Sequence, residues 1–124
     1  GSNLSGLGNA GSLNFGIVSK DSTASNASKV LEKGKVNVVG TAANNTGNAH
    51  DMPAISGLSA GDIISVKFHI SDLSPGTKSI TISGNGSDTI SIDGSATVVV
   101  DSPNAAVDFV YIGADSGTGR FIIT

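Results

Sequence analysis

The clearest pattern in this 124-residue chain is a series of short apolar–polar alternations in its second half. Residues 63–70, IISVKFHI, place Ile64, Val66, Phe68 and Ile70 on one face of an extended strand. Similar runs follow at 79–83, 89–92, 96–100, 107–112 and 120–124, separated by turns rich in Gly, Asp and Ser. Short strands at this spacing are typical of an all-β sandwich or jelly roll. We therefore predict an all-β, β-sandwich or jelly-roll-like domain of short antiparallel strands.

The same alternation predicts roughly seven to nine strands, no helix longer than about two turns, and the residues of the core. Apolar side chains that share one face of a strand point to the same side of the sheet. The expected core residues are Ile64, Val66, Phe68, Ile80, Ile82, Ile90, Val107, Phe109 and Tyr111.

The first half of the chain is less regular. LNFGIV, from Leu13, is a plausible strand in which Gly16 marks a bulge. Residues 20–34, with 24–33 at their centre, fit a short helix closed by Gly34 or a hairpin, KVLE-KG-KVNVV, that turns at Lys33-Gly34. We favour the hairpin because KVNVV is clearly a strand and needs a partner nearby.

The domain boundaries follow from glycine content and polarity. Residues 1–12 predict a linker or shaft transition, Gly1-Ser2 resembles a cloning scar, and residues 13–124 predict one β domain. Residues 41–54 predict a long polar loop, and loops of that length are often functional.

Composition narrows the classes of function. Gly, Ser, Thr and Asn make up 55 of the residues, but the many Ile and Val residues argue for a folded β protein. A net charge of −3 without a basic cluster argues against nucleic-acid binding, and no apolar run is long enough for membrane insertion. The absence of cysteine excludes disulfides and thiol catalysis. Because only five residues are aromatic, we expect oligomerisation to supply part of the buried surface.

Residues 83–91, SGNGSDTIS, match a calcium-binding nonapeptide repeat except for its first glycine. Such repeats bind calcium between stacked copies, and only one copy is present here. We therefore predict a tight glycine turn in which Asp88 bonds backbone amides.

Other candidate chemistry is sparse, and we predict no catalytic, cofactor-binding or metal-binding residues. His50 is interpreted as a solvated loop residue and His69 as a polar-face strand residue, without the further ligands of a metal site. GADSGTGR, residues 113–120, lacks the ending of a phosphate loop and predicts a hairpin loop. The aspartates of the second half lie where turn chemistry favours them; they are Asp88, Asp93, Asp101, Asp108 and Asp115.

The sequence pattern of residues 55–124 resembles that of a known class of viral proteins. The runs SGLSAGDIISVKF, SITISGNGSDTISIDGSATVVV and DSPNAAVDFVYIGADSGTGRFIIT are similar to the distal domains of bacteriophage tail fibres, tailspikes and tail needles. NLSGLGNAG also resembles the shaft-to-knob transitions of such fibres, while the rest of the first 54 residues matches no family pattern. The resemblance implies a homotrimeric virion protein of the tail, which recognises a cell surface through β-structured protomers packed about a threefold axis.

The sequence is therefore compatible with three functions. The leading hypothesis is a structural, non-enzymatic trimeric tip or C-terminal domain of a phage tail appendage, which attaches the virion to a host glycan or outer-membrane receptor. The alternatives are a monomeric bacterial extracellular carbohydrate-binding or adhesin module, and a hydrolase fragment. We expect the receptor to bind the 41–54 loop, with 71–78 and 113–120 as further candidate loops. The candidate residues of the 41–54 loop are Asn44, Asn45, Asn48, His50 and Asp51, and that of the 113–120 loop is Arg120, the only arginine.

Overall fold

The computed structural model describes residues 16–20, 29–39, 48–69, 79–102 and 104–124, and these are mostly β-strand with almost no helix. The all-β prediction is therefore confirmed. The strands of the described residues are β1 (Ile17–Ser19), β2 (Val36–Val39), β3 (Asn48–Asp51), β4 (Ile63–Phe68), β5 (Ile80–Ser83), β6 (Thr89–Ile92), β7 (Val98–Val100), β8 (Ala106–Asp115) and β9 (Thr118–Ile123), with a short 3-10 helix, η2 (Ile55–Gly57). Within these ranges no helix is long and apolar enough to cross a membrane.

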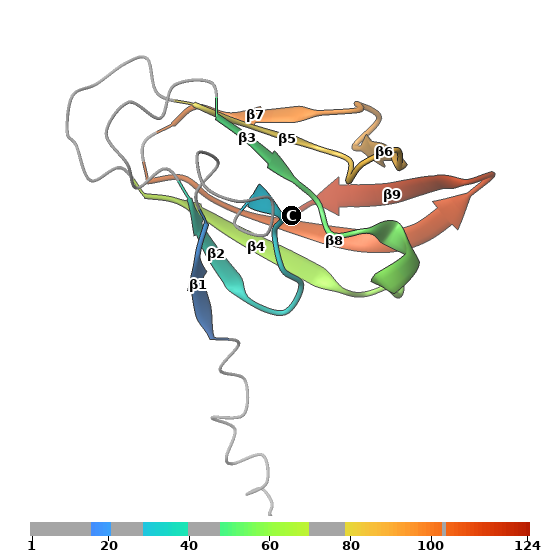
Figure 1. Cartoon of the computed structure of the whole chain (residues 1–124), viewed down its shortest axis with the longest axis horizontal. Helices are drawn as coiled ribbons and strands as arrows, with labels where there is room; N and C mark the ends of the chain where they lie inside the picture. Colours follow the sequence, from blue (N-terminus) through green and yellow to red (C-terminus); the bar gives the residue numbers. More distant parts are fainter. Residues whose placement is uncertain (1–15, 21–28, 40–47, 70–78, 103) are drawn as a thin grey trace, which may run out of the picture.

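The strands form two sheets that lie one above the other (Figure 1). The larger sheet has six strands in the order β1-β2-β4-β8-β9-β6, and the smaller has three in the order β3-β5-β7. From β1 to β7 the chain passes repeatedly from one sheet to the other. Apart from β1–β2 and the β8–β9 hairpin, hydrogen-bonded neighbours in each sheet are therefore not consecutive strands of the chain.

The expectation that the strands are antiparallel is wrong for four of the seven strand pairs. The pairs β1–β2, β2–β4, β3–β5 and β6–β9 are parallel, whereas β4–β8, β5–β7 and β8–β9 are antiparallel. Alternation of apolar and polar residues fixes which face a side chain points to, but not the direction of the strand. Between β1 and β2 the chain reaches the opposite sheet at Val30, which bridges Asp51, and between β2 and β4 it forms β3 there, so it re-enters the larger sheet in the same direction each time.

The hairpin favoured for residues 29–39 is also wrong, although its turn is present. Gly34 has a φ of 70°, which suits the predicted turn. The segment before the turn pairs with the other sheet instead, because Val30 bridges Asp51 and the Leu31 amide donates to the Asp51 carbonyl at 2.8 Å. Lys29 has helical backbone, and residues 21–28 lie outside the described residues.

Two tight turns follow the predicted chemistry. Asp93 and Gly94 have φ values of 48° and 92°, and Ile92 and Ser95 exchange two backbone hydrogen bonds of 2.7 and 2.9 Å across them. After this single pair β7 joins the smaller sheet. The last hairpin, β8–β9, turns at residues 116–117 and contains a bulge between Tyr111 and Gly113, so the predicted 113–120 hairpin loop is mostly strand.

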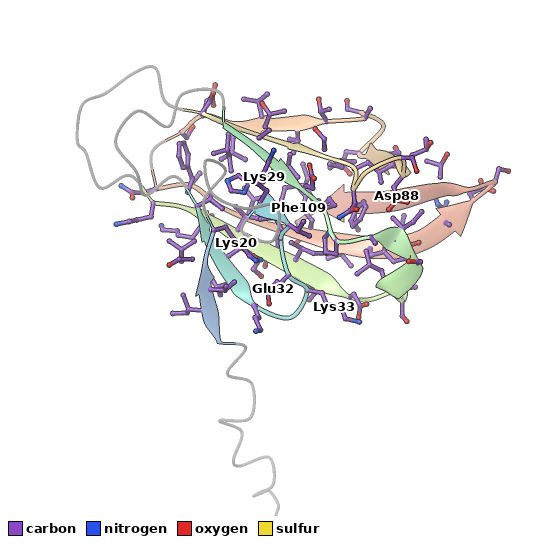
Figure 2. All side chains as sticks on the ribbon, in the orientation of Figure 1. Lys20, Lys29, Glu32, Lys33, Asp88 and Phe109 are labelled. Carbon is purple, nitrogen blue, oxygen red and sulfur yellow. The ribbon has the colours of Figure 1, made fainter. Side chains whose placement is uncertain are left out.

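The core lies between the two sheets, with Phe109 fully buried near its middle (Figure 2). Eight of the nine predicted core residues are buried, and Val107 is partly buried against them. Tyr111 and Phe121 pack with ring centroids 5.2 Å apart. The core also contains residues outside the predicted set: Leu31, Val39, Met52, Ile92, Val100 and Phe121.

Candidate functional site

One end of the molecule collects the ends of strands from both sheets (Figure 1). In the larger sheet Val39 pairs with Phe68, and the next residue, His69, donates its amide to the Val39 carbonyl at 2.9 Å. In the smaller sheet Asn48, Ile80 and Val100 lie in register at the same end. The connections 40–47, 70–78 and 101–105 therefore all begin and finish at this end of the sheets, which we call the loop end. The segments 40–47 and 70–78 themselves lie outside the described residues.

The candidate residues of the 41–54 segment are not one loop. Asn44 and Asn45 lie outside the described residues, but Asn48 begins β3, which continues through His50 to Asp51. The loop prediction is wrong for these four residues because β3 obtains its backbone partners from β5, which holds a polar sequence extended without help from its own strand propensity.

His50 is not the solvated residue expected from the sequence. Its side chain is 1% exposed, and Nδ1 lies 3.2 Å from the carbonyl oxygen of Lys29. The imidazole thus helps to connect β3 to the segment before β2. A surface role in receptor contact does not fit this burial, whereas Asp51 is half-buried at the other end of the strand.

Arg120 lies far from the loop end along the sheet. It is exposed on β9, opposite Gly113 of β8, and its Nε lies 3.4 Å from the Gly113 carbonyl oxygen. The hairpin that carries Arg120 closes at the end of the molecule opposite to the ends of β4 and β2 (Figure 1). Arg120 therefore lies at the opposite end of the molecule from Asn48, where β3 begins. His69, by contrast, is exposed at the loop end, which agrees with its predicted polar environment.

A partly buried polar cluster, which the sequence did not predict, holds the segment before β2 against the larger sheet (Figure 2). Lys20, 5% exposed, pairs with the Glu32 carboxylate at 2.7 Å, and Lys35 reaches the same carboxylate at 3.2 Å. The hydrogen bond from Lys20, followed by that from Lys35, holds the pKa of Glu32 below its ordinary value of 4.5. Lys20 is buried beneath this pair of contacts, while the Glu32 and Lys35 side chains remain partly exposed to solvent.

Asn37 completes this cluster from the middle of β2. Its side chain is fully buried; Oδ1 accepts the Glu32 amide at 2.9 Å, and Nδ2 donates to the Glu32 carbonyl at 3.0 Å and the Ser65 carbonyl at 2.9 Å. The side-chain amide thus pairs with the Glu32 backbone as a neighbouring strand would. The signal in the sequence was a lone asparagine inside the valine strand KVNVV, which only a partnered, buried amide explains.

The segment that imitates a calcium site is a structural turn, as predicted. Asp88 accepts the Ile55 amide on Oδ2 at 2.9 Å, and Asn85 Nδ2 donates to the Met52 carbonyl at 3.2 Å (Figure 2). A Cβ on Gly84 would lie 2.7 Å from the Asp88 carbonyl oxygen, which explains the glycine at that position. The turn therefore fastens the segment between β3 and β4 to the connection between β5 and β6. Among the described residues no three His, Asp or Glu side chains gather as they would to hold a metal ion.

A shallow apolar groove of about 250 Å³ opens beside β7. The smaller sheet is narrower than the larger one, so the ends of β8 and β9 are left incompletely covered there. Val107 and Ile123 line the groove, together with the three valines of β7, and Ile123 remains 39% exposed. The groove adjoins the loop end, because Asp101, Ser102 and Ala105 of the 101–105 connection also line it.

Comparison with models of protein families and with curated proteins found no match to this chain.

Proposed function

We propose that this chain is a structural, non-enzymatic domain at the tip or C-terminal end of a phage tail appendage, where it attaches the virion to the host surface as a homotrimer. The observation that carries the attachment role is the loop end, because several connections leave a packed β scaffold on the same side. Loops held in this way can vary in sequence while the strands keep them in place.

The partner that suits this end is a host glycan or an outer-membrane receptor rich in hydroxyl groups. Asn44, Asn45 and Asn48 provide amide groups in or beside the 40–47 connection, whereas Asp51 lies at the other end of β3. Each such bond replaces one with water, so single contacts contribute only about 1 kcal/mol and binding depends on several together. His50 is left out of this group because its imidazole is buried. Arg120, at the opposite end, would serve only a second, separate contact.

The finer description of the fold is part of the same proposal. Two facing sheets around one core support a β-sandwich. The four parallel pairs favour a sandwich with both parallel and antiparallel strand pairs over a regular, antiparallel jelly roll. In a trimer, neighbouring protomers would cover edges and faces that one protomer leaves exposed.

The attachment role is tested by binding of the fluorescently labelled domain to a panel of bacterial cells and to their purified surface polysaccharides. Replacing Asn44, Asn45 and Asn48 together with alanine is expected to weaken binding about 100-fold, from roughly 1 kcal/mol for each of the three lost contacts. Thr89→Ala, an exposed change on β6 far from the loop end, is the matched control and should bind as the wild type does. Unchanged binding by the triple variant would refute the assignment of this end.

Light scattering tests the assembly. A mass three times the 12.2 kDa of one chain agrees with the tail domain, whereas a folded 12.2 kDa monomer that still binds cells would favour the bacterial adhesin module.

A further inference from the structure

The six-stranded sheet carries a row of apolar side chains on the face that points away from the core. Ile63 of β4 pairs with Val110 of β8, and Val110 pairs with Ile122 of β9, so the three side chains are direct cross-strand neighbours. Burial alternates along β4 and through residues 118–122 of β9, and the inward neighbours Ile64, Phe109, Tyr111 and Phe121 are fully or almost fully buried, while Ile123 is partly exposed at the groove. Ile63 and Ile122 nevertheless remain 40% and 38% exposed. The row therefore lies on the outside of the sheet, which we call the outer face.

The apolar character extends across most of this face. Ile112, at the bulge beside the row, is 38% exposed. Toward the other edge Ile17 of β1 pairs with Val36 of β2, and Ile17 is 76% exposed. Val38 points to the same side two residues further along β2. The outer face thus presents branched apolar side chains from β1 to β9.

A sheet of this kind is usually covered on both faces. When one face of a sheet is open to water, polar side chains normally occupy it. The exposed parts of Ile17, Ile63, Ile112 and Ile122 together equal roughly two whole isoleucine side chains. Burying that much apolar surface would contribute about 3–6 kcal/mol per protomer, which is a strong drive toward association.

The size of the face indicates what covers it. Six strands about 4.8 Å apart make it about 24 Å wide, and a six-residue strand such as β4 makes it about 20 Å long. A single helix, about 10 Å across, or an extended peptide would leave much of this area exposed. The partner is therefore another broad protein surface, of the order of the ~800 Å² that each side contributes to a standard interface.

The charges of the face favour a second copy of this chain as that surface. The outward positions of the described strands of this sheet carry two positive and two negative side chains: Lys67, Arg120, Asp108 and Asp115. The face has no net charge, so a second copy meets no overall repulsion and offers an opposite charge for each of these groups. A polyanionic partner would find no basic patch here.

We propose that copies of this chain associate through the outer face of the six-stranded sheet, centred on Ile63, Val110 and Ile122. The inference rests on the proposed trimer, because it names the surface through which the protomers meet. Close contact at this face would complete the burial of a sheet that is already apolar on its inner side.

The test is the mass of the double variant Ile63→Glu/Ile122→Glu, measured by light scattering and by sedimentation over a range of concentrations. Both side chains point away from the core, so the fold should be retained, while two buried carboxylates per protomer would oppose association. The expected mass is 12.2 kDa with an unchanged circular dichroism spectrum. Val99→Glu is the matched control: Val99 is 54% exposed on β7 of the other sheet, and this variant should keep the wild-type mass.

Two outcomes would overturn the proposal: a wild-type chain that is monomeric at about 100 µM, or a double variant that keeps the wild-type mass. A dimer that the double variant dissociates would support the interface while refuting the threefold assembly, so the two proposals can fail separately. Single cysteines provide a second measurement that does not require the variant to dissociate, since the chain contains no cysteine. Ile122→Cys should form covalent dimers with a short bismaleimide and Val99→Cys should not; the reverse pattern would contradict the interface.

Discussion

Replacing Asn37 with alanine should be among the most destabilising single changes in this protein. The substitution removes four hydrogen bonds of 2.9–3.3 Å made by a fully buried side chain, and it leaves the Glu32 amide and the carbonyls of Glu32, Lys35 and Ser65 without that partner. A buried polar group that loses its partner costs about 1–3 kcal/mol, and water entering the space would recover part of that cost. We expect the free energy of unfolding to fall by about 2–5 kcal/mol, a large part of the ~5–15 kcal/mol typical of a domain.

The assay is chemical and thermal unfolding followed by circular dichroism at equal protein concentrations. At this chain length each kcal/mol corresponds to roughly 3–5 °C, so Asn37→Ala should lower the melting temperature by about 6–25 °C. Asn85→Ala is the control, because Asn85 makes one longer bond of 3.2 Å to the Met52 carbonyl; its cost should stay near 1 kcal/mol. If the two variants proved equally stable, the view that Asn37 fastens the Glu32 segment to β2 would be refuted.

Three further predictions concern the ion pairs and turns. The folded state holds the pKa of Glu32 below its ordinary value, so the free energy of unfolding should decrease as pH falls through the acid range below about 4.5. Glu32→Gln should make the melting temperature less dependent on pH in this range, as measured by acid titration. Gly84→Ala should destabilise by about 1–3 kcal/mol, since its Cβ would lie 2.7 Å from the Asp88 carbonyl, whereas Gly57→Ala, with open space around it, should cost less than about 1 kcal/mol in the same denaturation series. Millimolar calcium should leave the melting temperature unchanged, because Asp88 already accepts the Ile55 amide; a rise of several degrees would show that the 83–91 turn binds the ion.

The sequence supported correct predictions wherever local chemistry decides the structure. Asp93-Gly94 turns the chain as this dipeptide usually does, and the alternation of 63–68 correctly separated buried Ile64 and Phe68 from exposed Ile63. The errors arise where partners distant in sequence decide. Asn48–Asp51 contains no β-branched residue and becomes a strand only beside β5.

The candidate site was harder to predict than the fold, for the same reason. His50 in a polar sequence looks like a solvated side chain, and only the pairing of β3 and the position of Lys29 place it in the interior. The outer face was partly visible in advance, because VYI and FII interrupt strict alternation and place apolar residues on both sides of a strand. Its continuity across β4, β8 and β9 depends on register, which one sequence does not reveal.

The winding of the chain between the two sheets has a consequence for how the domain acquires its structure. In each parallel pair the partners are distant in sequence, as with Ile17 and Val36 or Val36 and Ser65, so a long loop must close before either pair can form. The β8–β9 hairpin has no such requirement, since its strands meet at a two-residue turn. Folding should therefore start near the C-terminal hairpin, add β4 and then β2, and finish with β1, at the slow rates typical of domains rich in non-local contacts. During synthesis the N-terminal strands could therefore pair within the sheet only after the last residues of the domain have left the ribosome.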